Sequence, residues 1–167
     1  MEVTSLYETY FDRYTALVPE KTLQEAFKNQ DSVLNDYLAN VTEEKSNYSY
    51  APEKWTLKEM LQHMIDTERI FTYRALAFAR KDPANLPGFD ENLYAENSEA
   101  NRRTWAALAE EIRAVRSSTK FLFASFTPEM LEATGTFNDN EGKVKTMGFI
   151  IAGHVYHHMK VAKERYF

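Results

Sequence analysis

The sequence predicts an all-α protein, and specifically a four-helix bundle, on three observations. Four segments of about 20 residues carry apolar residues at the spacing of one helix face. The 167 residues include only 5 glycines and 5 prolines, too few for the many tight turns of a β-sandwich or small barrel. No stretch of the sequence shows sustained β alternation. The length favours a single domain, which we expect to span residues 1–167.

The first two predicted helices begin with the same capping signal. The sequence TLQE at 22–25 opens the first, whose apolar face continues to Val41, and TLKE at 56–59 opens the second, which continues to Arg80. In such a capping box the threonine hydroxyl and the glutamate carboxylate each bind a free backbone N–H. Both helix starts are therefore defined by the local sequence.

The third and fourth predicted helices differ in regularity. Between Trp105 and Phe126 the apolar residues alternate at spacings of 3 and 4, and Pro128 marks the end of this helix. The fourth runs from about Thr146 to the C-terminus and contains Gly148 and Gly153. Each glycine weakens a helix by roughly 1 kcal/mol relative to alanine. We expect the close approach of a neighbouring helix as the compensation.

The connections between these helices set the expected topology. Residues 81–98 form a connection much longer than the 2–8 residues that usually join antiparallel neighbours. A chain of that length can run back along a whole helix, so helices 2 and 3 are expected to be parallel. The segment 127–145 is also long and has room for a helical turn around 128–131. Residues 1–20 are rich in aromatic residues and form either an arm wrapped around the bundle or a short helix.

Composition excludes several classes of function. A net charge of -5 argues against nucleic-acid binding and against docking on an anionic membrane. The absence of cysteine excludes disulfides, thiolate metal sites and a cysteine nucleophile, and it suits a cytoplasmic protein. The N-terminal sequence lacks the basic start and apolar run of a signal peptide, and the most apolar stretch, 147–153, is too short to span a bilayer.

Histidines provide the candidate functional site. His63 lies in the middle of the second helix, and His154, His157 and His158 lie on the fourth. His154 and His158 are one turn apart on the same face, whereas His157 points roughly 60° away from His154 and is the weaker candidate ligand. An H-x-x-x-H pair alone is also common among core or surface histidines, but a third inward imidazole on a facing helix favours a metal site. Asp66, one turn after His63, is expected either to orient that imidazole or to add a fourth ligand.

Several motifs resemble those of the DinB family, and together they cover nearly the whole chain. They are YAPEKWTLKE at 50–59, LQHMIDTE at 61–68, FTYRALAFAR at 71–80, LPGFD at 86–90, IAGHVYHH at 151–158 and ERY at 164–166. The resemblance implies a four-helix bundle of up-down-down-up topology and a homodimer. It also implies a divalent metal ion held by one histidine of the second helix and by the H-x-x-x-H pair of the fourth. In this sequence those residues are His63, His154 and His158.

The resemblance supports two kinds of function. Some members of the family transfer low-molecular-weight thiols such as bacillithiol, or isomerise maleylpyruvate with mycothiol, so the first expectation is a metal-dependent thiol S-transferase or hydrolase with a small-molecule substrate. The alternative is a non-catalytic, metal-bearing module that dimerises or binds a partner. An open coordination position beside a pocket would favour the enzyme, and a closed shell of ligands would favour the module.

Two further points stay open at the level of sequence. Three imidazoles suit Zn, Ni, Fe or Mn, so they do not identify the metal. Glu68, Arg69 and Arg74 share a helix with His63, and they are either anchors for an anionic thiol or ordinary surface charges in i,i+4 pairs.

Overall fold

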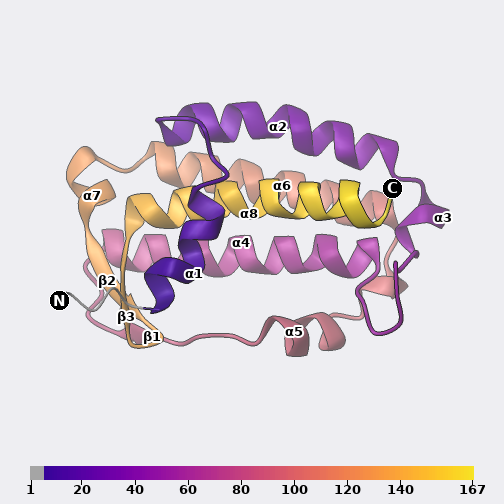
Figure 1. Cartoon of the computed structure of the whole chain (residues 1–167). Coiled ribbons are helices and arrows are strands. Elements are labelled where there is room, and N and C mark those ends of the chain that lie inside the picture. Colours follow the sequence, from indigo (N-terminus) through magenta and orange to yellow (C-terminus); the bar gives the residue numbers. More distant parts are fainter. Residues whose placement is uncertain (1–5) are drawn as a thin grey trace.

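The computed structural model describes residues 6–167, a mostly helical chain whose four long helices form a bundle (Figure 1). These helices are α2 (Leu23–Asn40), α4 (Leu57–Ala79), α6 (Trp105–Ala124) and α8 (Val144–Arg165). They correspond to the four predicted segments, with ends that differ by at most two residues from the expected bounds. Residues 1–5 of the predicted N-terminal arm lie outside the described residues.

The two predicted capping boxes form to different extents. At α4 the Thr56 hydroxyl accepts from the backbone N–H of Glu59, and the Glu59 carboxylate accepts from the backbone N–H of Thr56 at 2.7 Å. At α2 the Thr22 hydroxyl also accepts from the backbone N–H of Glu25, but it donates to the Glu25 carboxylate at 2.8 Å. The complete box therefore stands at the start of the helix that carries His63.

Helices α4 and α6 run in the same direction (Figure 1). Contacts between them occur in the same order along both helices, as parallel helices require. Arg69 on α4 pairs with Glu111 on α6 at 2.7 Å, and Thr72, one turn later, lies 3.3 Å from Thr119. The connection between the two helices therefore returns along the length of the bundle, and it contains β1 (Asn85–Leu86), α5 (Glu91–Asn97) and the 3-10 helix η1 (Ala100–Arg102).

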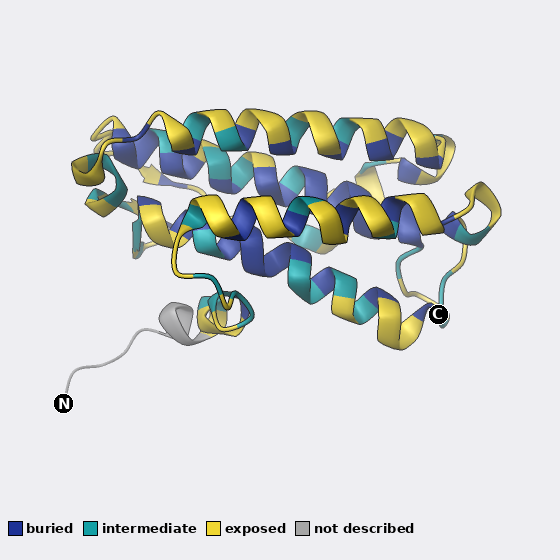
Figure 2. Ribbon diagram, turned by 90° about the horizontal axis from the view of Figure 1, so that it is seen from above, coloured by how far each residue is buried: buried dark blue, intermediate teal, exposed yellow. Residues whose placement is uncertain are grey.

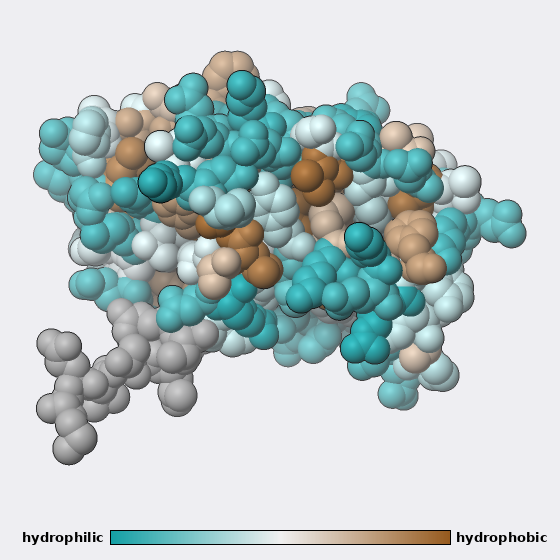
Figure 3. Space-filling model, turned by 45° about the horizontal axis from the view of Figure 1, so that its top comes forward, coloured by the Kyte–Doolittle hydropathy of each residue, from teal (hydrophilic) through white to brown (hydrophobic). Residues whose placement is uncertain are grey.

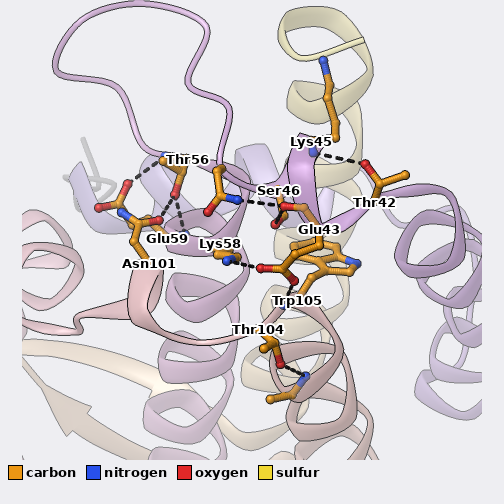
Figure 4. A network of polar contacts seen from close by, with 12 residues as sticks. Thr42, Glu43, Lys45, Ser46, Thr56, Lys58, Glu59, Asn101, Thr104 and Trp105 are labelled. Carbon is orange, nitrogen blue, oxygen red and sulfur yellow. Dashed lines mark hydrogen bonds and ion pairs between the residues drawn. The ribbon is translucent and has the colours of Figure 1, made fainter.

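A polar network fixes the end of the bundle where this connection arrives. The Glu43 carboxylate, on the short helix α3 (Glu43–Ser46), accepts from Lys58 Nζ at 2.5 Å and from the backbone N–H of Trp105 at 2.7 Å (Figure 4). Thr56 donates from its hydroxyl to Asn101 at 2.7 Å. The starts of α4 and α6 are thereby tied to the same short helix.

The prediction of an all-α protein is wrong in one respect, because a small three-stranded sheet is present. β2 (Thr134–Phe137) pairs antiparallel with β3 (Asn140–Lys143) and parallel with β1. The strands of two and four residues are too short to show alternation in the sequence. Asn138 and Asp139 between β2 and β3 have φ values of 47° and 62°, as the favoured two-residue hairpin turn requires. The predicted helical turn near Pro128 is confirmed as α7 (Pro128–Glu132).

The N-terminal segment contains the short helix α1 (Leu6–Thr15), which contacts α8 (Figure 1). Its close approach depends on Gly153. A Cβ placed on Gly153 would lie 2.0 Å from the backbone oxygen of Tyr14, which is an impossible contact. The glycine that weakens α8 therefore permits the backbone of α1 to lie directly against it, as the sequence led us to expect.

Buried residues lie on the inward faces of the long helices, and exposed residues lie on the outward faces (Figure 2). On the face shown in Figure 3, hydrophilic residues dominate and apolar residues occur in small separate groups. Among residues 6–167, no helix combines the length and apolar character needed to cross a membrane.

Candidate metal centre

Three imidazoles converge in the interior of the bundle. The Nε2 atom of His154 lies 3.0 Å from Nε2 of His63 and 3.0 Å from Nε2 of His158. The nitrogen ligand atoms of all three residues lie within 4.8 Å of one another. The structure therefore brings together the three histidines that the sequence singled out.

The positions of α4 and α8 explain this convergence. The two helices are neighbours in the bundle, and His63 faces α8 from the first half of α4. His154 and His158 are four residues apart on α8, so their side chains project from the same side. All three residues are at most 9% exposed.

Hydrogen bonding alone cannot satisfy these three nitrogens. Each neutral imidazole Nε2 has either one proton or one lone pair, so His154 Nε2 makes at most one good hydrogen bond to its two neighbours. In addition, Nδ1 of His158 is buried and has no hydrogen-bond partner within the described chain. Two nitrogens that each bind one ion at about 2.1 Å are at most about 4.2 Å apart, so the observed 3.0 Å fits a shared cation. The residues present therefore fit a divalent metal ion.

Burial keeps the imidazoles neutral, which is the form that binds metals. Burial, with a smaller contribution from the neighbouring His157, lowers the pKa of His63 from 6.5 to about 4. For His154 and His158 burial again is the main cause, with the other histidines adding to it, and it holds each pKa well below 6.5. At neutral pH the cluster thus offers lone pairs and carries no charge of its own.

The environment of His63 differs from the one expected. Asp66 does not reach the imidazole, because its carboxylate accepts from Gln62 Nε2 at 2.9 Å and lies 4.0 Å from Arg69. It also lies outside the group of converging ligand atoms. Thr67, four residues after His63, has its hydroxyl 3.5 Å from Nδ1. When Nδ1 donates to that hydroxyl, the Nε2 lone pair faces the centre.

His157 lies beside the cluster and outside it. Its ring centroid is 5.0 Å from that of His158 and 5.4 Å from that of Tyr14. It is half-buried and contributes to the wall of the neighbouring cavity. The structure thus separates the three converging imidazoles from the fourth histidine.

A cavity of about 860 Å³ opens beside the three imidazoles. Its walls come from α1, α4, α8, the connection after β1 and the β2–β3 turn, and much of the lining is aromatic. The aromatic residues include Phe11, Tyr14, Trp55, Phe71, Phe89 and Phe137. The volume suits a small organic molecule.

The three charged residues proposed to hold an anionic thiol have different roles. Glu68 pairs with Arg116 at 2.8 Å in the bundle interior and does not line the cavity. Arg69 is 51% exposed and pairs with Glu111. Only Arg74 lines the cavity, where its guanidinium donates to the Pro87 carbonyl at 2.9 Å and lies 4.4 Å from the centre of the Phe137 ring. For Glu68 and Arg69 the structure therefore does not support the thiol anchor, and the ion pairs of Arg69 agree with the other alternative, an ordinary surface charge.

Several cavity residues were missed by the sequence reasoning. Trp55 packs on His63 with ring centroids 4.8 Å apart, and Tyr14 packs edge-on against His154 at 5.4 Å. Arg13 and Asn138 also line the cavity. Gly153 was the one available signal for Tyr14, because it predicted the approach of another element next to His154.

The fold and the histidine cluster together define a helical-bundle protein with a candidate metal centre beside a small-molecule cavity. The sequence model of the DinB superfamily matches residues 26–162, so the chain belongs to this superfamily. Among solved structures it is similar to YfiT from Bacillus subtilis, described as "a probable metal-dependent hydrolase with an unusual four-helix bundle topology". The likeness has a TM-score of 0.68 at 13% sequence identity and covers 96% of this chain and 90% of YfiT. A comparison with curated proteins finds no match.

Proposed function

We propose that His63, His154 and His158 bind one divalent metal ion and that the protein is a metal-dependent hydrolase acting on a small molecule. The observation that carries the proposal is that three Nε2 atoms converge next to a cavity of about 860 Å³. The Nε2 atom of His154 lies 3.0 Å from each of the other two. A buried ion with only three protein ligands keeps positions for water and substrate. The superfamily and the description of YfiT support the same class.

The division of roles follows from the residues present. When bound, the ion polarises a substrate oxygen or lowers the pKa of a bound water towards about 7. The chain has no cysteine, and within the described residues neither the cluster nor the cavity wall supplies a serine nucleophile. For hydrolysis, the nucleophile we propose is a water molecule from solution. The aromatic wall excludes bulk water from the substrate, and Thr67 orients His63.

Transfer of a low-molecular-weight thiol is the second candidate. The cavity favours it, because 860 Å³ has room for a thiol beside an electrophilic substrate. A divalent ion would then stabilise a thiolate in place of hydroxide. The opening beside the cluster supports either enzyme over a non-catalytic module, for which a closed set of ligands is typical.

Other parts of the proposal concern the molecule as a whole. The shared direction of α4 and α6 supports an up-down-down-up order of the four long helices. From the family resemblance we also propose a cytoplasmic homodimer. Zn, Ni, Fe and Mn are all compatible with three imidazoles, so direct analysis of the native protein is needed to identify the metal.

The first experiment measures metal per chain in the wild type, in His158→Ala and in the matched control His157→Ala. We expect about one ion in the wild type and in the control, and a large loss in His158→Ala with little change in helical content. Occupancy should persist well below pH 6.5 and fall as the pH approaches about 4, where His63 takes up a proton that competes with the metal. Equal loss in the two variants would refute the assignment of ligands.

The second experiment tests the reaction class. Ester, amide and phosphoester substrates are compared with thiol-conjugation substrates, using native, chelated and metal-reloaded protein. Activity that disappears with the chelator and returns with the metal supports the enzyme, and the panel that responds decides between hydrolysis and thiol transfer. Metal binding without any activity would support the non-catalytic module.

A further inference from the structure

Arg13 places an unneutralised positive charge at the wall of the metal cavity. It lies on α1, lines the cavity together with the histidines, and donates from its guanidinium to the Tyr14 hydroxyl at 2.6 Å. The guanidinium also lies 4.0 Å from the centre of the Tyr10 ring and 4.6 Å from that of Tyr14. The side chain is therefore held in one place by aromatic contacts and one hydrogen bond.

No acidic partner balances this charge within the described chain, in which Arg13 forms no ion pair. Its hydrogen-bond partner is neutral, because burial raises the pKa of Tyr14 to about 12 and keeps the hydroxyl protonated. Arg13 is an exposed residue at the cavity wall, so its remaining N–H donors are accessible to a carboxylate or phosphate.

The acidic residues of the cavity lie on a different wall. Asp90 accepts from the backbone N–H groups of Asn92 and Leu93 at the start of α5, so its carboxylate caps that helix. Glu91 follows it on the same element. Arg74 adds a second positive charge to the lining. Among the described cavity residues of α1, Arg13 is the charged one, so the positive charge on this wall comes from Arg13.

We propose that Arg13 binds the anionic group of the substrate, and that this substrate is an organic carboxylate or phosphate attached to an apolar body. The proposal rests on the proposed metal-dependent function. Arg13 supplies the charge and N–H donors, and Phe71, Phe89 and Phe137 contact the apolar body. Arg13 is then a specificity-determining residue, and the three imidazoles remain the metal ligands.

The test compares three small probes of similar shape. Benzoate, phenyl phosphate and the neutral benzamide are titrated into zinc-loaded and metal-free full-length protein, and dissociation constants are measured by calorimetry and ligand-observed NMR. The variants are Arg13→Gln, Arg13→Lys and the control Arg165→Gln, which removes the same charge from an exposed position on the last turn of α8. Zinc content and thermal midpoint are recorded for each variant.

We expect Arg13→Gln to bind benzoate or phenyl phosphate about tenfold more weakly, as for one lost charge-assisted hydrogen bond, and to bind benzamide unchanged. Arg13→Lys should keep most of the affinity, and Arg165→Gln should match the wild type. The anion with the larger loss identifies carboxylate or phosphate. Unchanged anion binding in Arg13→Gln, benzamide binding as tight as the anions, or no anion binding to the wild type would overturn the proposal. Failure of the proposed function is a separate result, since it appears as zinc content near zero in the wild type.

Discussion

Two clusters of buried polar side chains include residues of the same helix, α4, and differ in whether they contain paired charges. Around Glu68, the carboxylate forms an ion pair with Arg116 at 2.8 Å without a well-directed hydrogen bond, and Arg116 donates to Gln30 at 2.6 Å. Gln30 in turn donates to the Ala152 carbonyl on α8. Opposite charges therefore meet inside the bundle, and the cluster joins four helices.

The histidine cluster contains no such pair of opposite charges. It consists of three imidazoles whose Nε2 atoms point towards one another, those of His63, His154 and His158. A cavity opens beside them. Both clusters are buried and polar, so burial alone does not distinguish a site from a structural element. Polar groups that lack a partner and border a cavity do indicate a site, because only a ligand can supply the missing partner.

The largest effect should come from the ionic cluster. Arg116→Met leaves the Glu68 carboxylate buried without its counter-charge, so we expect a loss of about 3–5 kcal/mol in the free energy of unfolding, measured by denaturant titration. Replacing both residues, Glu68→Leu with Arg116→Met, should recover most of that loss. Metal content per folded chain should be unchanged in the double variant. A single variant as stable as the wild type would mean that the pair is solvated and that the comparison fails.

The histidine cluster should make the stability of the metal-free protein depend on pH. Unfolded histidines take up protons near pH 6.5, whereas burial holds the pKa of folded His63 at about 4 and those of His154 and His158 well below 6.5. The unfolded state binds more protons, so the stability present above pH 6.5 is lost as the pH falls. Each imidazole should contribute about 1.4 kcal/mol between pH 7.5 and 5.5. His158→Gln should remove one such share, and an identical pH profile in that variant would contradict the prediction.

Substitutions of the two glycines of α8 test how α1 is held against the histidine cluster. Gly153→Ala forces a Cβ against the Tyr14 backbone, so α1 must move, at a cost of about 1–3 kcal/mol in unfolding free energy. Limited proteolysis should then cut more readily between α1 and α2. Gly148→Ala is the control, since its Cβ meets only side-chain atoms of Leu23 and Phe123, which can shift. Equal effects of the two substitutions would show that α1 is not held at Gly153.

The smallest effects should distinguish the roles in zinc binding of two adjacent residues on α4, Thr67 and Asp66. Thr67→Val removes the hydroxyl beside Nδ1 of His63, and we expect about tenfold weaker zinc binding in a competition titration. Asp66→Asn should change the affinity by less than about twofold, because that carboxylate contacts Gln62 and Arg69. The reverse order would restore the role first expected for Asp66.

The long helices were predictable because their signals are local. Capping at Thr56, the regular apolar spacing from Trp105 and the i,i+4 pair His154–His158 depend on a few consecutive residues. The sheet was missed because pairing between Leu86 and Phe137 depends on residues far apart in sequence. Short strands stabilised by such pairing leave no periodic pattern.

The environment of the site was harder to predict than its ligands. Spacing on one helix does not distinguish Asp66 from Thr67 as the partner of His63, because residues at i+3 and i+4 both lie near it. The position of Arg13 depends on the crossing of α1 over α8, which only the backbone contact at Gly153 indicates. Glu68 was a candidate for ligand binding because the sequence does not show its ion-pair partner, Arg116, which belongs to a different helix.

The pairing of β1 with β2 has a consequence for how related proteins diverge. The converging histidines belong to α4 and α8, whereas Phe89 and Asn138 line the cavity from two connections. The backbone N–H of Asn138 donates to the Leu86 carbonyl at 2.8 Å, and Asn85 and Asp139 exchange two more hydrogen bonds. Mutations in these connections can change which molecules the cavity admits while the imidazoles stay in place. Because the connections are bound to each other, they are expected to evolve as one unit, inherited or replaced together.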